Sequence, residues 1–187
     1  TTPMPRRRDA LVAAARFVDA VNETALEMPG RQVATVGHLE VEPGAPNVIP
    51  GRVVLSLEIR DLSMEGILRV HEAVTARARA IGDATGTAFS FHRFYVSEAA
   101  PTHPRIRDLV EAEAGELGLS TLRMPSGAGH DAQSIAAFAP VGMIFVPSRD
   151  GISHAPEEFT APEEVARGAD VLLRTLLALD GIELEPA

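Results

Sequence analysis

The sequence predicts an α/β protein with two unlike halves, and three observations lead to this prediction. Apolar residues recur at helical spacing in some segments and alternate at strand spacing in others. The first half has the order helix, strand, strand, helix, strand, which is the order of a ferredoxin-like β-α-β-β-α-β unit that lacks its first strand. After a short linker at residues 97–101, helices alternate with short apolar runs, as they do in α/β layers.

In the first half, residues 9–24 have the apolar spacing of an amphipathic helix. Residues 33–41 and 53–59 alternate as strands, and the turn-rich stretch between them predicts that they are antiparallel neighbours. A second helix is predicted over residues 63–81, beginning at a serine cap, and a third strand over residues 87–96. Because no strand precedes the first helix, the predicted sheet has an open place, and we expect the native chain to extend further upstream.

In the second half, helices are predicted over residues 104–117, 131–138 and 162–179. Residues 119–124 and the near-continuous apolar run at residues 141–146 are predicted to be strands. Two strands are too few for a sheet that covers both faces of a catalytic domain. We therefore expect this half to be incomplete as well.

The composition excludes several classes of protein. The chain is 45% apolar and carries a formal net charge of −9, which argues against nucleic acid as the main partner because phosphate binding needs a basic surface. No apolar run approaches the roughly 18 residues of a membrane helix, and the N-terminus lacks the apolar stretch of a secretory signal. The absence of cysteine excludes disulfides and thiolate chemistry and suits a reducing compartment. We expect a cytoplasmic protein with no membrane and no nucleic-acid partner.

Two loops in the second half carry candidate functional residues. Ser126-Gly-Ala-Gly-His-Asp131 and Gly151-Ile-Ser-His-Ala-Pro-Glu-Glu158 each place a histidine beside acids and glycines after an apolar run. Imidazole in such a loop is either a metal ligand or a polar contact for substrate, and glycines let backbone amides approach a bound group. A metal or acid–base centre needs several partners, and the chain has no His-x-His, His-Glu-x-x-His, cysteine pair or P-loop to supply them.

Five motifs, in order along the chain, carry a resemblance to a known family. They are Thr1-Thr-Pro-Met-Pro-Arg-Arg-Arg-Asp-Ala-Leu11, Pro46-Asn-Val-Ile-Pro-Gly-Arg52, Leu57-Glu-Ile-Arg-Asp61, Met124-Pro-Ser-Gly-Ala-Gly-His-Asp-Ala132 and Ser153-His-Ala-Pro-Glu-Glu-Phe159. Over essentially its whole length the chain resembles the amidase/hydantoinase/carbamoylase branch of the zinc-exopeptidase-like hydrolases. This branch includes N-carbamoyl-L-amino-acid hydrolase, β-ureidopropionase and allantoate amidohydrolase. The motifs are specific for the branch and do not fix the member.

The resemblance implies a catalytic domain with two divalent metal ions (Zn, Mn, Co or Ni), interrupted by a lid domain that also forms a homodimer. Residues 1–98 would be the lid/dimerisation domain without its first strand, and residues 99–187 the C-terminal part of a zinc-exopeptidase-like α/β catalytic domain. The general-base glutamate and the other metal ligands would lie in an upstream half, so no catalytic residue is assigned to this chain. The 187-residue chain alone is expected to be inactive and to bind little or no metal.

The resemblance also implies roles for individual residues. His154 matches the metal ligand contributed by the C-terminal segment, and Glu158 would orient it or a neighbouring group. The alternative is a loop whose histidine only hydrogen-bonds the backbone. Arg60 matches the arginine that binds the substrate carboxylate, a task for which a planar guanidinium is suited. Its alternative is a surface ion pair with Glu58 or Asp61.

Three more positions are carried over from the family motifs. Asn47 matches a carboxamide that hydrogen-bonds the substrate, with ordinary turn chemistry as the alternative. Gly129 would offer a main-chain contact to substrate and His130 a polar contact, while Asp131 would support the loop without touching the substrate. The alternative is a strand-to-helix turn in which His130 and Asp131 cap a short helix.

Three functions are consistent with these features. The first is part of a metal-dependent amidohydrolase, in which metal-activated water cleaves the C–N bond of a carboxylate-bearing N-carbamoyl amino acid or related ureido compound. The second is a stand-alone dimerisation or small-molecule-binding module. The third is a peptidase or aminoacylase relative with the same fold. The Gly-Ala-Gly-His-Asp stretch favours the first function over the third.

Overall fold

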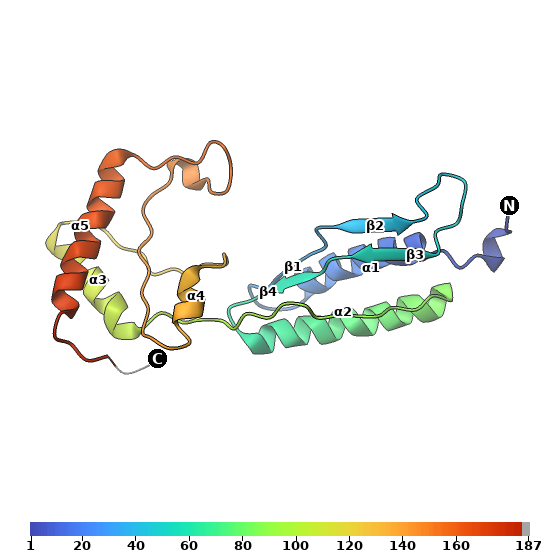
Figure 1. Cartoon of the computed structure of the whole chain (residues 1–187), viewed down its shortest axis with the longest axis horizontal. Coiled ribbons are helices and arrows are strands. Elements are labelled where there is room, and N and C mark those ends of the chain that lie inside the picture. The colour runs from blue at the N-terminus through green and yellow to red at the C-terminus, as the bar shows by residue number, and fades with distance from the viewer. Residues whose placement is uncertain (185–187) are drawn as a thin grey trace. The chain divides into compact units, whose positions relative to one another are not determined.

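The chain is described by a computed structural model that covers residues 1–184. It divides into two compact units, Thr1–Ala99 and the part that begins at Ala100, and each is treated by itself below (Figure 1). Sequence analysis placed the division after residue 98. In the described part, no helix is both long and apolar enough to cross a bilayer.

The first unit contains two long helices and four short strands (Figure 1). In chain order its elements are η1 Met4–Arg6, α1 Ala10–Glu27, β1 Val33–Thr35, β2 Leu39–Glu42, β3 Arg52–Leu55, β4 Glu58–Arg60 and α2 Met64–Thr85. β1 pairs antiparallel with β4, placing Val33 opposite Arg60, and β2 pairs antiparallel with β3, placing Leu39 opposite Leu55. The two predicted strands are therefore confirmed as antiparallel neighbours, although each is broken into two short pieces.

The two helices begin and end where the sequence supplies capping groups. At the start of α1, Asp9 Oδ1 accepts hydrogen bonds from the N–H groups of Leu11 and Val12, at 3.0 and 3.2 Å. At the start of α2, Ser63 Oγ accepts one from the N–H of Gly66, at 3.1 Å. The helix α2 ends at a glycine, residue 86, whose φ of 65° lies in the left-handed region. Both predicted helices are confirmed, and each continues about one turn beyond its expected end.

Both helices pack on one face of the strands and enclose the core of this unit. The buried cluster consists of Phe17 and Val21 from α1 and of Val70, Val74 and Ala78 from α2. Alternate residues of the strand region pack against it from the other side, because successive strand side chains point to opposite faces. The inward residues are Ala34, Val36, Leu55, Leu57 and Ile59.

Residues 87–96 do not form the third strand that the sequence predicted, and that prediction is wrong. The segment is extended, yet it belongs to neither of the two-stranded sheets in the described part. Phe89 anchors it to the core, with 5.3 Å between its ring centroid and that of Phe17. Alternation in sequence specifies an extended backbone, whereas a strand also needs hydrogen bonds from a neighbour, and none of the described strands supplies them here. In place of the predicted ferredoxin-like sheet, the described residues form two short antiparallel pairs.

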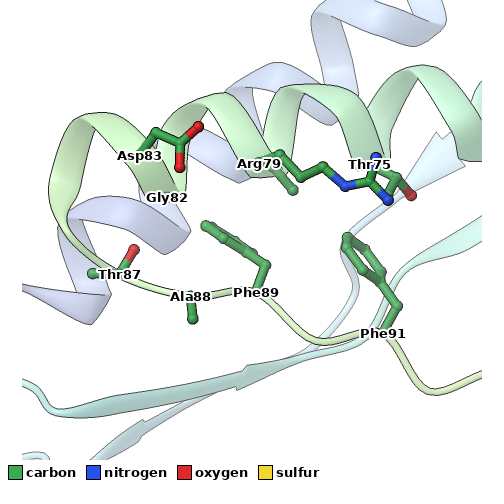
Figure 2. Close-up of a pocket in the computed structure, with 9 residues that line it drawn as sticks. Thr75, Arg79, Gly82, Asp83, Thr87, Ala88, Phe89 and Phe91 are labelled. Atoms are coloured by element: carbon green, nitrogen blue, oxygen red, sulfur yellow. The ribbon is translucent and has the colours of Figure 1, made fainter.

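A cavity of about 300 Å³ lies between α2 and this extended segment (Figure 2). Thr75, Arg79 and Asp83 line it from the helix, and Phe89 and Phe91 line it from the other side. Within the described part of the chain, the hydroxyl of Thr75 is buried without a hydrogen-bond partner. None of the residues that sequence analysis assigned to a functional site lines this cavity.

The second unit consists of helices joined by long extended segments (Figure 1). Its elements are α3 Pro104–Glu116, α4 Asp131–Ile135, η2 Arg149–Gly151 and α5 Pro162–Leu179. The three predicted helices are confirmed, α4 in a shorter form. The helices α3 and α5 pack together through buried residues that include Ile106, Ala114 and Val171, and Arg174 of α5 donates a hydrogen bond of 2.7 Å to Glu113 of α3.

The strands predicted at residues 119–124 and 141–146 are also not formed, so these two predictions are wrong. The second segment nevertheless packs closely on the helices. A Cβ at Gly142 would lie 2.3 Å from Ile106 Cγ2, and a Cβ at Gly168 of α5 would lie 2.4 Å from Val146 Cγ1. Burial within the run is partial, because Val141 is buried whereas Phe145 is 53% exposed. The run did not specify a hydrogen-bonded ladder, because a ladder requires a neighbouring strand that the described residues of this unit do not provide.

An ion-pair cluster ties the first of these segments to α3. Arg123 Nη2 lies 2.7 Å from Asp108 Oδ1 and 2.6 Å from Glu111 Oε2. The hydrogen bond from Arg123, followed by its positive charge, lowers the pKa of Glu111 below its usual value of 4.5. A carboxylate with a lowered folded-state pKa stabilises the fold above the unfolded-state pKa, and this contribution is lost as the pH falls through the folded-state pKa.

We expect Arg123→Gln to raise the pKa of Glu111, because both the hydrogen bond and the charge that lower it are removed. A carboxyl-detected NMR titration between pH 2 and pH 7 measures this directly. Arg167→Gln is the matched control, since Arg167 pairs with Glu164 on α5 at 2.7 Å and should leave the Glu111 titration unchanged. An equal Glu111 pKa in the Arg123 variant and in the parent chain would show that the ion pair does not form in solution.

Candidate active-site loops

The glycine loop before α4 is organised by a serine and a histidine. Ser126 Oγ lies 2.7 Å from His130 Nε2 and accepts a hydrogen bond of 3.2 Å from the N–H of Ala128. His130 is the N-cap residue of α4, and its backbone N–H donates to Gln133 Oε1 at 3.4 Å. The edge of its imidazole meets the ring of Phe145, with 5.8 Å between the centroids. The His130 ring is therefore held by a hydroxyl and by an aromatic ring.

The glycines of this loop have no local steric reason to be glycine. Neither Gly127 nor Gly129 has a positive φ. A Cβ at Gly127 would meet no atom within 4 Å, and one at Gly129 would meet only Gln133 Oε1, at 3.6 Å. Asp131, the first residue of α4, is exposed. His130 therefore caps α4, as the alternative interpretation predicted. The loop also has free space beside Gly127 and Gly129.

The second histidine lies in a loop that closes on itself. The backbone N–H of Arg149 donates to the carbonyl of Phe159 at 2.8 Å, and Ser148 Oγ donates to the carbonyl of Ile152 at 2.6 Å. The guanidinium of Arg149 stacks 4.3 Å from the centroid of the Phe159 ring. These contacts fix both ends of the loop that carries His154.

His154 itself has an uncommon backbone conformation. Its φ of 57° lies in the left-handed region, which few residues other than glycine adopt. Its backbone N–H donates to Glu158 Oε2 at 2.7 Å, so the predicted proximity of the two residues is observed, but through the backbone of the histidine. The side chain is exposed, and no residue of the described part hydrogen-bonds to its imidazole. The loop therefore presents an imidazole whose backbone is fixed and whose ring nitrogens are available.

A complete metal centre needs more ligands than this loop supplies. Among residues 1–184, no group of three or more histidine, aspartate or glutamate side chains is arranged to hold a metal ion. A single imidazole orders a divalent ion poorly, whereas several converging ligands share the cost of ordering.

Arg60 lies in the first unit, at the end of β4. Its Nη2 is 2.9 Å from Glu58 Oε1, and the two side chains are 48% and 60% exposed. The surface ion pair that was the alternative interpretation is therefore present. Such an exposed pair is worth about 0–1 kcal/mol, which is small enough for a better-placed carboxylate to replace Glu58.

Asn47 lies in the turn between β2 and β3, where the N–H of Val48 donates to the carbonyl of Ala45 at 3.2 Å. Its side chain is exposed and has no hydrogen bond within the described part of the chain. Turn chemistry accounts for its backbone and leaves its carboxamide available.

Ser126 had no predicted functional role. In the structure, however, its hydroxyl contacts the His130 ring. The available signal was its place at the start of the glycine loop, four residues before the histidine. That spacing brings two side chains together on a helix, but it does not do so in general in a loop. Contact between these two side chains was therefore not predictable from spacing.

Comparison with known families places this chain among the hydrolases. A model of Peptidase family M20/M25/M40 matches residues 8–178. The chain belongs to this family, and the resemblance inferred from the five motifs is confirmed by individual relatives. It is 39% identical over 180 residues to an N-carbamoyl-L-amino-acid amidohydrolase of Paenarthrobacter aurescens, covering 96% of this chain and 44% of the relative. It is 35% identical to the allantoate amidohydrolase of Bacillus subtilis, covering 96% of this chain and 43% of that protein.

Solved structures give the same placement. The crystal structure of an amidase of the hydantoinase/carbamoylase family from Burkholderia vietnamiensis matches with a TM-score of 0.86 and 37% identity, covering 95% of this chain and 43% of that one. A Bacillus subtilis protein described as a dinuclear metal binding peptidase of the M20 family shares the fold, with a TM-score of 0.72 and 17% identity. The chain thus spans less than half the length of the relatives it matches.

Proposed function

We propose that this chain forms part of a metal-dependent amidohydrolase that cleaves the C–N bond of N-carbamoyl amino acids or related ureido compounds. Membership of the family supports this proposal, and so do relatives named for N-carbamoyl-L-amino acids and for allantoate. The observation that best supports the proposal is the left-handed backbone conformation of His154, together with its exposed imidazole. A left-handed backbone costs a residue with a side chain on the order of 1–2 kcal/mol, and it persists only where surrounding contacts impose it. Here those contacts fix the backbone of a residue whose exposed imidazole has no hydrogen-bond partner among the described residues.

His154 suits a divalent ion, because a neutral imidazole is a good ligand for Zn, Mn, Co or Ni. By family membership we expect two ions in a complete site, with the other ligands coming from the part of the relatives' length that this chain does not span. Bound metal would supply an activated water for attack on the carbonyl. The contribution of this chain is to fix the ligand: Glu158 binds the backbone N–H of His154 and so limits the positions its ring can take.

The remaining residues are proposed to bind the substrate in the complete protein. Arg60 would exchange its exposed pair with Glu58 for the substrate carboxylate, which it can bind through two parallel hydrogen bonds. Asn47 would add a carboxamide contact, and Gly129 a main-chain contact that the free space beside it allows. His130 would provide a polar contact, with Asp131 supporting the start of α4.

The first unit is proposed as the lid and dimerisation domain, with the second unit as the C-terminal part of the catalytic domain. The outward faces of the strands carry exposed apolar side chains that would suit a homodimer contact: Val33 and Val54. The absence of cysteine suits a cytoplasmic location, which is part of the proposal.

The function is tested with the full-length protein, loaded in turn with Zn, Mn, Co and Ni. N-carbamoyl-L-amino acids, β-ureidopropionate and allantoate are compared with dipeptides and N-acyl amino acids as substrates. We expect ammonia release from at least one compound of the first group. Hydrolysis confined to dipeptides or N-acyl amino acids would replace the proposal with the peptidase or aminoacylase alternative. Binding of carbamoyl compounds without hydrolysis under any metal would favour a binding module.

In the same protein, Arg60→Ala should weaken binding of carboxylate substrates by on the order of 2–4 kcal/mol, because a charge-assisted pair is lost. Metal content should be unchanged. Competition by a substrate and by its carboxamide analogue measures the effect, and the analogue should lose almost nothing. Arg52→Ala is the matched control, because Arg52 forms a similar exposed pair with Glu42 at 2.5 Å on the neighbouring strands. Equal losses for substrate and analogue would mean that Arg60 is structural.

A further inference from the structure

We propose that Ser126 is a positioning residue for His130. Its hydroxyl fixes the imidazole in one orientation, so that the glycine loop presents a preset polar group to the substrate. This inference rests on the proposed function, and it adds a residue to which neither the family motifs nor the comparisons assign a role. The juxtaposition that carries it is the 2.7 Å contact between Ser126 Oγ and His130 Nε2.

The hydroxyl of Ser126 is itself held in place. It accepts the N–H of Ala128 at 3.2 Å, so one of its two acceptor positions is used by the backbone of the loop. A hydroxyl that is free to rotate gives little orientation to a neighbour, whereas one fixed by the backbone transfers the geometry of the loop to the ring. Both side chains are half-buried, so water competes less with this contact than it would on an open surface.

The ring of His130 is also restrained away from the hydroxyl. Phe145 meets it edge-on at 5.8 Å, and its backbone is fixed at the start of α4 by the bond of its N–H to Gln133. The hydrogen bond to Gln133 fixes the backbone of His130, and the Phe145 ring limits rotation of the imidazole. Ser126 then selects one of the two flipped ring orientations, because it bonds Nε2. A preset group avoids reorganisation when the substrate binds, which is the general advantage of preorganised polar contacts.

A nucleophilic role for Ser126 is less consistent with the same contacts. A serine nucleophile needs its histidine to be oriented by a third group on the other ring nitrogen, usually a carboxylate. Asp131 is adjacent in sequence, but no hydrogen bond between its carboxylate and the imidazole is present among the described residues. Ser126 therefore orients His130, and among the described residues no carboxylate hydrogen-bonds the imidazole as a catalytic triad would require.

The test uses the metal-loaded full-length protein and the variants Ser126→Ala, Ser126→Thr and Ser134→Ala. Ser134 is an exposed serine on α4, four residues beyond His130, and serves as the matched control. We expect Ser126→Ala to lower kcat/KM by about 10- to 100-fold with metal content unchanged, which is a typical cost of misplacing a group that contacts substrate. Ser126→Thr should recover most of this loss because it keeps the hydroxyl. Ser134→Ala should resemble the parent.

The second measurement does not depend on activity. Nitrogen-15 chemical shifts of the His130 ring report the hydrogen bonding of each ring nitrogen, and we expect Ser126→Ala to change the shift of Nε2 while Ser126→Thr and Ser134→Ala do not. If no substrate is turned over, the proposed function fails, and these shifts still decide whether Ser126 sets the state of the ring. Unchanged ring shifts in Ser126→Ala, equal kinetics in the two alanine variants, or a covalent adduct on Ser126 found by mass spectrometry would each overturn the inference.

Discussion

His154→Ala in the full-length, metal-loaded protein is expected to lower bound metal and activity together, with activity falling by at least about 100-fold. Loss of a residue that only supports a metal ligand already costs 10- to 100-fold in many metalloenzymes, so removal of the ligand itself should cost no less. The imidazole is exposed and unpartnered within the described residues, so its loss removes no internal hydrogen bond. Elemental analysis alongside the hydrolysis assay measures both quantities.

The left-handed backbone at this position calls for a second variant. Asparagine adopts this conformation more readily than alanine does, so His154→Asn removes the imidazole while straining the loop less. If the two variants lose the same amount of metal, the loss arises from the ligand and not from the loop. His92→Ala, at an exposed histidine of the first unit, is the control that should keep full metal content. Sizing chromatography should show an unchanged oligomer for all three, and unchanged metal in His154→Ala would return this motif to a structural loop.

Phe17→Ala is expected to destabilise the first unit by about 3–5 kcal/mol, the usual cost of removing a buried aromatic side chain and leaving a cavity. Phe17 is 1% exposed at the centre of the α1–α2 core and meets both Phe89 and Phe91, with ring centroids 5.3 and 6.0 Å away. Amide hydrogen exchange in the 187-residue chain measures the effect unit by unit. The most protected amides of α1 and α2 should exchange faster by the corresponding factor.

Two comparisons make this prediction specific. Phe94→Ala removes the same side chain from a position that is 80% exposed, and it should change protection by less than about 0.5 kcal/mol. The amides of α5 serve as an internal reference, because the cluster around Phe17 lies entirely within the first unit. Equal loss of protection in α1 and α5 would contradict the confinement of the Phe17 core to the first unit.

The helices could be predicted from the sequence because their determinants are local. Asp9 and Ser63 cap α1 and α2 from adjacent positions, and the apolar faces repeat within each segment. The three failed strands, at residues 87–96, 119–124 and 141–146, share one cause. Their apolar patterns specify an extended backbone, whereas pairing depends on hydrogen bonds from a neighbouring strand. Local sequence does not report whether such a strand is there.

The sequence predicted which loops carry the candidate site residues. It predicted fewer of the contacts that these residues make. Spacing and glycine content pointed to the loops of His130 and His154, and the proximity of Glu158 to His154 was expected from the family resemblance. The sequence did not indicate that His154 has a left-handed backbone, because backbone conformation at a single loop residue depends on the closure of the whole loop. For Arg60, both interpretations were available beforehand, and the structure shows the ion pair with Glu58.

The unpaired extended segments have a practical consequence for handling this chain. They belong to no sheet among the described residues, and extended backbone outside a sheet is a template on which another copy can add by β-pairing. The net charge of −9 opposes this association through mutual repulsion, but salt at physiological strength screens that repulsion over about 8 Å. Aggregation of the isolated 187-residue chain would therefore grow with concentration and ionic strength and reach no fixed stoichiometry. A species of that kind is distinct from a homodimer formed through the first unit, and low-salt, dilute preparations separate the two.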